Sequence, residues 1–333
     1  MADTIKAYGA AGPNEKLQPV SIKRRAPDEN DVVIDIKYAG ICHSDLHVVN
    51  GYEWGPIYFP MVPGHEIAGI VRSVGKNVTK FKVGDHVGVG NMVNSCRSCD
   101  NCKIGEEHFC SGDGKINSND PKENFAPTAG GYSQMIVVDK DFVLSIPDGI
   151  PLDKAAPLLC AGITMYSPLN HWNAGPGKRV AIIGLGGVGH IGVKIAKYAL
   201  GAEVTVLSQS LSKKELGLSL GADKYYATSD AETFTALKGY FDLIVNTVSS
   251  NLNLDQYVSL LGIGGALVEV GVPLNPIITG SYIGSIRETQ EMLNFCGKHG
   301  ITAEIETIPA SKILGPFVKS DVRFRFVIDI STL

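Results

Sequence analysis

The sequence predicts an α/β protein with a β-rich domain and a second domain built on a doubly wound parallel sheet. Three observations lead to this fold class. Short alternating segments bounded by glycine dominate the first half, continuous apolar segments alternate with helical ones in the second half, and a glycine-rich turn follows the first of those apolar segments. The length of 333 residues also favours two domains over one.

The first half is expected to be β-rich. Ile34 and Ile36 fall on one face of an alternating segment, and Asp35 and Lys37 fall on the other. Other short, β-branched segments predict further strands, over 66–74, 83–89 and 135–138. Residues 111–128 are rich in Asn, Asp, Gly and Pro, which predicts a loop.

The second half alternates strands with helices. Residues 180–183 are continuously apolar, which is typical of a strand buried on both faces. The remaining strands are predicted over 204–207, 243–246, 267–270 and 324–328. Helices are predicted over 152–166, 188–199, 213–220 and 289–298. Strands that alternate with helices imply a parallel sheet.

Four closely spaced cysteines form the pattern C-x2-C-x2-C-x7-C: Cys96, Cys99, Cys102 and Cys110. Four thiolates suit tetrahedral Zn²⁺, and a site that they fill is closed to substrate and therefore structural. The alternative is a disulfide framework, but an odd total of seven cysteines, clustered in this way, favours a reducing compartment.

Charge and terminal composition limit the partners. The net charge of −4 offers no electrostatic argument for binding nucleic acid or an anionic membrane. The N-terminus has no basic segment followed by an apolar one, and no apolar stretch is long enough to span a bilayer. We therefore expect a soluble, cytoplasmic protein.

A glycine-rich turn predicts a dinucleotide site, because Gly184, Gly186, Gly187, Val188 and Gly189 fit G-x-G-x-x-G. The first glycine allows the tight turn, the second allows a pyrophosphate to approach the backbone, and the third allows the helix to pack on the strand. The motif alone is weak, but here it follows a buried strand and opens a helix.

Residues after the second strand favour NADPH over NADH. An NAD site places a carboxylate there to bind the ribose 2′-hydroxyl. This chain instead has Ser208 and Ser210, with Lys213 and Lys214 close behind. Hydroxyls and an ammonium suit a 2′-phosphate, although both lysines could instead lie on a solvated helix surface.

Cys42, His65 and Cys160 are candidates for a second metal site. Two thiolates and one imidazole leave a fourth tetrahedral position open for water or substrate, as in a catalytic zinc site. Spacing does not prove this, because the three residues lie far apart in the sequence. A cysteine that follows two leucines, as Cys160 does, is usually a small core residue.

These motifs, taken in order, resemble the zinc-dependent medium-chain alcohol dehydrogenases, most closely the cinnamyl-alcohol-dehydrogenase-like, NADPH-dependent aldehyde reductases. The resemblance covers almost the whole chain. It is carried by residues 42–47, 62–66, 84–85, the four-cysteine lobe, 158–164 and 184–189. It implies a GroES-like catalytic domain over 1–153 and 285–333, a Rossmann domain over 154–284, two zinc ions per subunit and a homodimer.

The resemblance also implies roles for single residues. Cys42, His65 and Cys160 resemble the catalytic zinc ligands, and the four lobe cysteines resemble the structural ones. Asp45 resembles the acid that orients the ligand His65, and Glu66 resembles a carboxylate that can approach the metal. The remaining assignments concern protons and cofactor: Ser44 and His47 resemble a proton relay, Thr164 a nicotinamide contact, and His43 and Arg325 pyrophosphate contacts.

The implied reaction is reversible hydride transfer between NADP(H) and an alcohol or aldehyde. An NAD-linked polyol or simple-alcohol dehydrogenase is an alternative, as is a non-catalytic dinucleotide-binding protein on the same fold. The chain departs from the family pattern near residues 274–277 and 313–316, where longer segments are usual. Tyr52 and Trp54 are candidates for an aromatic wall of the substrate pocket, with ordinary packing as the equal alternative.

Overall fold

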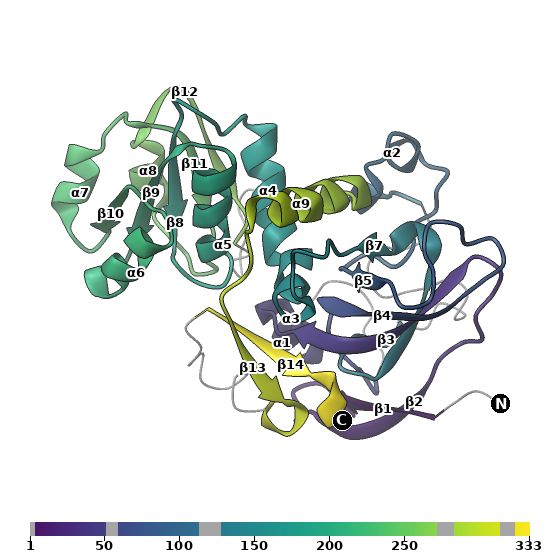
Figure 1. The fold of residues 1–333 in the computed structure, drawn as a ribbon. Helices are drawn as coiled ribbons and strands as arrows, with labels where there is room; N and C mark the ends of the chain where they lie inside the picture. Colours follow the sequence, from purple (N-terminus) through teal and green to yellow (C-terminus); the bar gives the residue numbers. More distant parts are fainter. Residues whose placement is uncertain (1–3, 51–58, 113–127, 272–282, 314–323) are drawn as a thin grey trace. The chain divides into compact units, whose positions relative to one another are not determined.

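The computed structural model describes residues 4–50, 59–112, 128–271, 283–313 and 324–333. These residues fall into two compact units (Figure 1). The first unit comprises Met1–Cys160, Ser285–Gly297 and Thr302–Leu333, and the second comprises Ala161–Gly284 and Lys298–Ile301. Among the described residues, no helix combines the length and apolar character that crossing a bilayer requires.

The first unit is built on a seven-stranded sheet in the order β13-β14-β3-β4-β5-β7, with β6 also paired to β3. Its strands are β3 (Asp31–Gly40), β4 (Ile67–Val74), β5 (His86–Val89), β6 (Met135–Asp139), β7 (Leu144–Ser145), β13 (Ile305–Pro309) and β14 (Arg325–Asp329). All pairs are antiparallel except β13 with β14. The predicted strands of the first half are confirmed.

Two further strands cover one face of this sheet. β1 (Thr4–Gly9) and β2 (Gln18–Lys23) form an antiparallel pair that the sequence analysis missed. Ile5 of β1 packs against Val33 of β3 and against Met135 and Val137 of β6. Val33 is therefore buried although it lies beside the buried Ile34, because both faces of β3 are covered.

The second unit contains the predicted parallel sheet. Its strands are β8 (Arg179–Ile183), β9 (Glu203–Ser208), β10 (Lys224–Ala227), β11 (Phe241–Asn246) and β12 (Leu261–Glu269), in the order β10-β9-β8-β11-β12. The chain runs outward from β8 in one direction and then returns to the other side of β8 at β11. Such a reversal creates the crevice in which open α/β sheets bind ligands.

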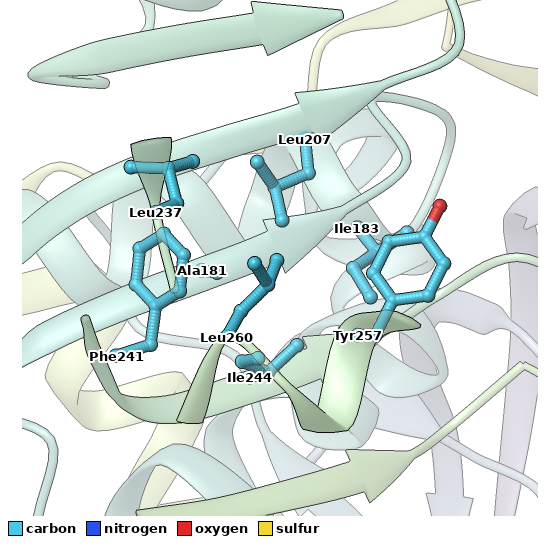
Figure 2. Close-up of a cluster of buried hydrophobic side chains, with 8 residues drawn as sticks. All are labelled: Ala181, Ile183, Leu207, Leu237, Phe241, Ile244, Tyr257 and Leu260. Atoms are coloured by element: carbon cyan, nitrogen blue, oxygen red, sulfur yellow. The ribbon is translucent and has the colours of Figure 1, made fainter. Parts of the chain in front are cut away.

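A dense apolar cluster holds the strands of this unit to one of its covering layers (Figure 2). Ala181, Ile183, Leu207 and Ile244 come from three neighbouring strands, and Tyr257 from helix α8 (Leu254–Val258) packs among them. The helices of the unit are α4 (Ala161–His171), α5 (Gly189–Lys194), α6 (Lys214–Ser219), α7 (Ala231–Ala236) and α8.

The helix predicted over 152–166 is wrong as a single element. Helix α3 (Leu152–Ala155) passes into a 3₁₀ turn over Ala156–Leu159, and α4 begins only at Ala161. Pro157 has no N–H to continue the α-helical ladder, and Cys160 has φ −122° and ψ −73°, outside the helical region. The break places Cys160 at a bend instead of on a regular helix face.

Other predicted helices differ mainly at their ends. The helix predicted over 188–199 consists of α5 followed by a π-helical turn, Ile195–Ala199, and a 3₁₀ turn precedes α6. Helix α9 (Ile286–His299) begins before the predicted residue 289, because Ser285 and Glu288 form a reciprocal capping box. The first unit also contains α1 (His43–Asn50) and α2 (Asp100–Lys103).

Candidate active site and cofactor turn

The four lobe cysteines lie together around the short helix α2. Their sulfur atoms are all within 4.8 Å of one another, and none of the four forms a disulfide. The Sγ atoms of Cys96 and Cys102 are 3.9 Å apart. Two thiolates that share a tetrahedral zinc at about 2.3 Å would be about 3.8 Å apart, so the spacing fits zinc.

The electrostatics of the lobe also favour a cation. Backbone N–H groups of Ser98 and Cys99 lower the pKa of Cys96 to about 7. Backbone N–H groups lower the pKa of Cys99 further, to about 5. Burial and the neighbouring thiolates raise the pKa of Cys102 to about 12. Crowded sulfurs therefore resist complete ionisation by themselves, and a bound divalent cation would balance their charge.

A second sulfur-containing cluster assembles three distant segments of the first unit. Cys42 lies just before α1, His65 lies before β4, and Cys160 lies at the bend between the 3₁₀ turn and α4. With Glu66 they offer four possible ligand atoms within 4.8 Å of one another. The Sγ atoms of Cys42 and Cys160 are 3.9 Å apart, which again matches two thiolates on one zinc.

Asp45 binds both ligand-bearing segments around this cluster. Its Oδ1 faces Nδ1 of His65 at 3.2 Å and accepts from the Gly64 N–H at 3.1 Å. Its Oδ2 accepts from the Cys42 N–H at 2.9 Å. A carboxylate on Nδ1 directs the other ring nitrogen of His65 toward a metal.

The ionisation of the cluster suits metal binding. A hydrogen bond from Cys160, followed by the interactions with His65 and Arg325, lowers the pKa of Cys42 well below its usual value despite burial. Burial lowers the pKa of His65, but the charge and hydrogen bond of Asp45, with Cys42, raise it to about 10. The raised pKa of His65 means that its surroundings stabilise a positive charge. The same surroundings favour a bound cation at this position.

Glu66 and Arg325 form a buried ion pair beside the cluster. Glu66 is 0% exposed and Arg325 is 5% exposed. Oε2 of Glu66 has no hydrogen-bond partner among the described residues. Gly40 makes room for this carboxylate, because a Cβ at Gly40 would overlap Glu66 Oε2.

Ser44, His47 and His43 lie on α1, immediately after Cys42. Oγ of Ser44 is 3.6 Å from Sγ of Cys42. The rings of His43 and His47 are one helical turn apart, with centroids 5.1 Å apart. Burial and the neighbouring His43 lower the pKa of His47, so its imidazole is neutral at pH 7.

The glycine turn of the second unit has the backbone geometry that a dinucleotide requires. Gly184 has φ +89°, and a Cβ there would lie 2.8 Å from Val248 Cγ2. A Cβ at Gly189 would overlap the Gly184 carbonyl oxygen, so only glycine allows α5 to pack this closely. No described atom lies within 4 Å of a Cβ placed at Gly186, which leaves that backbone open to a phosphate.

Lys213 reaches the glycine turn, since its Nζ donates to the Leu185 carbonyl at 3.1 Å. Ser208 is half-buried at the end of β9, and Ser210 is exposed, with its Oγ 2.9 Å from that of Ser212. An ammonium and two hydroxyls thus lie in the loop where an NAD site would hold an acid. Lys214 is exposed, and Thr164 is half-buried on α4.

A third group joins the cysteine lobe to helix α9. His108 is buried, and its Nε2 lies 3.3 Å from Glu106 Oε2, with Glu288 also close. Oε1 of Glu107 accepts from the Ile286 N–H at 2.6 Å. These contacts anchor the lobe to the first turn of α9.

Two other features bear on the sequence predictions. Tyr132, which the sequence analysis missed, is fully buried and donates from its phenol to Asp45 at 3.0 Å. The one signal for Tyr132 in the sequence is its place directly after two glycines and shortly before the strand predicted over 135–138. The expected aromatic wall near Tyr52 and Trp54, and the shortened segments 274–277 and 314–316, lie outside the described residues.

Comparisons with known proteins agree with the zinc-ligand clusters and with the glycine turn. The family profile "Alcohol dehydrogenase GroES-like domain" matches residues 28–148, and "Zinc-binding dehydrogenase" matches residues 187–298. The NADP-dependent alcohol dehydrogenase C 1 of Mycolicibacterium smegmatis is 57% identical over 99% of both chains. The aldehyde reductase YahK of Escherichia coli is 47% identical, also over 99% of both chains.

Solved structures show the same relationship. The cinnamyl alcohol dehydrogenase of Helicobacter pylori, complexed with NADP(H), matches with a TM-score of 0.91 and 40% identity over 99% of both chains. The alignment with the Mycolicibacterium smegmatis relative spans 347 positions, more than the 333 residues here, so that relative has residues without a counterpart in this chain. The chain belongs to the zinc-dependent medium-chain alcohol dehydrogenases, in the cinnamyl-alcohol-dehydrogenase-like group that its motifs predicted.

Proposed function

We propose that this protein is a zinc-dependent aldehyde reductase that transfers a hydride reversibly between NADP(H) and a primary alcohol or aldehyde. The observation that carries the proposal is the convergence of Cys42, His65 and Cys160, with ligand atoms within 4.8 Å of one another. Such a set holds zinc and leaves one tetrahedral position open. Relatives named as NADP-dependent alcohol dehydrogenase and aldehyde reductase support the cofactor and the substrate class.

The donor set fits zinc, which when bound polarises a carbonyl oxygen as a Lewis acid, while NADPH supplies the hydride. Cys42, His65 and Cys160 hold the catalytic ion, and the lobe cysteines hold the structural one. Asp45 orients His65 through the contact at Nδ1. The buried pairing of Glu66 with Arg325 keeps a carboxylate near the open position.

The proton needed for reduction is supplied from α1. Ser44 holds a proton on Oγ, next to the Cys42 sulfur and hence beside the reacting oxygen. His47 has a lowered pKa and is neutral at pH 7, so its ring takes a proton from solvent and passes it on toward Ser44. In the direction of oxidation the alcohol releases a proton, which a neutral imidazole can accept and a protonated one cannot.

The second unit supplies most of the residues that recognise the cofactor. The turn formed by Gly184, Gly186, Gly187, Val188 and Gly189 presents backbone N–H groups to the pyrophosphate. Ser208, Ser210 and Lys213 bind the 2′-phosphate. Thr164 contacts the nicotinamide, and His43 and Arg325, which belong to the first unit, contact the pyrophosphate.

We further propose the domain division 1–153 with 285–333, against 154–284, together with a homodimeric assembly and a cytoplasmic location. Support for the division comes from the matched profiles, which fall on either side of the proposed boundary near residue 154. The seven cysteines, none of which forms a disulfide, support the location.

The test is a screen of NADPH oxidation with aliphatic, benzylic and cinnamyl aldehydes, run beside metal analysis. The wild type should contain two zinc ions per chain and reduce at least one class. Ser44→Ala should lower kcat about 100-fold with both ions retained, because a positioned proton donor contributes about 10²–10⁴-fold. The exposed Ser219→Ala on α6 is the matched control and should behave as wild type.

Other outcomes would contradict the proposal in distinct ways. A preference for NADH would favour the NAD-linked polyol or simple-alcohol dehydrogenase. Nucleotide binding without turnover of any alcohol or aldehyde would favour a non-catalytic dinucleotide-binding protein. An unchanged kcat in Ser44→Ala would remove the proton relay alone.

A further inference from the structure

We propose that Tyr132 is a positioning residue of the zinc centre, whose phenol holds the Asp45 carboxylate in the orientation that presents His65 to the metal. The inference rests on the proposed function for its metal. It deepens that function by adding a third layer of residues around the ion, beyond the ligands and their direct partner.

The hydrogen bonds of Asp45 are the first argument for this role of Tyr132. Asp45 is 1% exposed, and each of its oxygens has two hydrogen-bond partners. Oδ1 contacts the Gly64 N–H and His65 Nδ1, and Oδ2 accepts from the Cys42 N–H and the Tyr132 phenol. An ionised carboxylate has about four acceptor positions, so this one is saturated.

The second argument is where the four hydrogen-bond partners of Asp45 lie in the chain. Three of the four belong to the segments that carry the ligands Cys42 and His65. Among the described residues, the Tyr132 phenol is the one hydrogen-bond donor to the Asp45 carboxylate that comes from a separate segment. That phenol therefore restrains the carboxylate independently of the residues that Asp45 orients.

The Tyr132 phenol is a suitable donor for this purpose. Burial, followed by the charge of Asp45, raises its pKa well above the usual value, so it keeps its proton at neutral pH. A hydrogen bond to an ionised acceptor is about twice as strong as one between neutral groups. Removing one partner of a buried charged group is correspondingly costly.

Tyr132 is also fixed against the turn that carries His65. Its N–H donates to the Pro63 carbonyl at 3.0 Å, and the Gly131 N–H donates to the Gly64 carbonyl at 2.7 Å. Gly64 has φ +108°, and a Cβ there would lie 2.7 Å from Tyr132 Cδ1. The ring therefore packs directly on the Gly64 turn.

A buried arginine fixes the segment that carries Tyr132. Arg24 donates to Ser133 Oγ at 2.8 Å, to the Met135 carbonyl at 2.9 Å and to the Gly130 carbonyl at 3.1 Å. A segment held in this way cannot move to let another group replace the phenol. Loss of the hydroxyl should therefore leave Oδ2 of Asp45 with the Cys42 N–H as its remaining donor.

The expected effect is faster loss of one zinc ion. Loss of a direct partner of a metal ligand typically costs 10–100-fold in metal affinity or activity. Because Tyr132 acts through Asp45, one step further out, we expect Tyr132→Phe to accelerate zinc loss about three- to tenfold from one site.

The experiment follows zinc release from the purified two-zinc holoenzyme into excess chelator with a colorimetric zinc indicator. Tyr132→Phe should accelerate one of the two phases and leave the other unchanged. Tyr257→Phe, which makes the same chemical change in the core of the second unit, should alter neither.

A double-mutant cycle separates positioning from packing. If Tyr132 acts through the Asp45 charge, its replacement by Phe should have a much smaller effect in an Asp45→Asn background. An equal effect in both backgrounds, or unchanged release from Tyr132→Phe, would each overturn the inference. If Tyr132→Phe does not fold, unchanged zinc release from Asp45→Asn alone would overturn it, because Tyr132 could then not act through Asp45.

The proposed function and this inference fail separately. Wild-type protein that holds fewer than two zinc ions, or that reduces no aldehyde, contradicts the proposed function. Wild-type protein that does both, with Tyr132→Phe releasing zinc at the wild-type rate, contradicts only the role of Tyr132.

Discussion

The substitution Gly40→Ala tests the packing around Glu66. Gly40 ends strand β3, and its N–H donates to the Glu66 carbonyl at 2.9 Å. A Cβ at this position would overlap Glu66 Oε2 and would lie 2.9 Å from both Cβ and Cδ of Glu66. The Glu66 side chain must therefore move, although it is fully buried and paired with Arg325.

The loss of stability caused by Gly40→Ala depends on whether the displaced Glu66 carboxylate keeps its ion pair with Arg325. If the backbone moved apart and the ion pair survived, overpacking would cost about 1–3 kcal/mol. If the carboxylate instead left Arg325 unpaired, the uncompensated buried charge would cost about 3–5 kcal/mol. The overlap involves the carboxylate oxygen itself, which favours the second outcome and a loss of about 3 kcal/mol or more.

Thermal unfolding of the holoenzyme measures this cost. A loss of about 3 kcal/mol corresponds to a decrease in Tm of about 6–12 °C. Gly149→Ala is the control, because a Cβ at this exposed glycine would make an ordinary contact of 3.5 Å with the Gly297 carbonyl. The control should change stability by less than about 0.5 kcal/mol. A Gly40→Ala protein with the Tm of the control would refute the reasoning.

Three further predictions concern the lobe, the cofactor and acid stability. Cys99→Ser should reduce zinc from two ions to one per chain and lower Tm, as metal analysis and calorimetry would reveal; retention of both ions would contradict the lobe assignment. Lys213→Ala should raise KM for NADPH about tenfold while KM for NADH stays unchanged, because the lost ammonium faces a phosphate that NADH lacks; equal increases would point to a general role in the turn. A hydrogen bond from Arg179 lowers the pKa of Asp242 below 3.8, so the pair contributes stability that is present above pH 3.8 and is lost as the pH falls through the lower folded-state pKa. Urea midpoints of Asp242→Asn should therefore fall less steeply below pH 3.8 than those of wild type, and parallel curves would show that Asp242 adds nothing to the acid sensitivity.

Features that depend on nearby residues were predictable from the sequence. The lobe cysteines are separated by short spacings, and the glycine turn lies between one strand and one helix. The parallel sheet followed from the alternation of apolar and amphipathic segments, and the structure confirms it. The roles assigned to single site residues stay predictions until the variants above are measured.

Features that depend on distant residues were not predictable from pattern alone. Cys160 looked like part of a helix, and only the bend after Pro157 brings its sulfur to Cys42, 118 residues away in the sequence. The contact of Tyr132 with Asp45 and the pairing of Arg325 with Glu66 also join residues that lie far apart in the sequence.

Periodicity, or spacing within a few residues, encodes the fold class, the cysteine lobe and the glycine turn, and these were therefore readable from the sequence. The family was identified by the resemblance of motifs spread along the whole chain. The tertiary structure decided which buried polar groups meet around the second metal cluster. The physical reason is that a buried charge must find its partner wherever the packed strands place one, and local sequence does not record that distance.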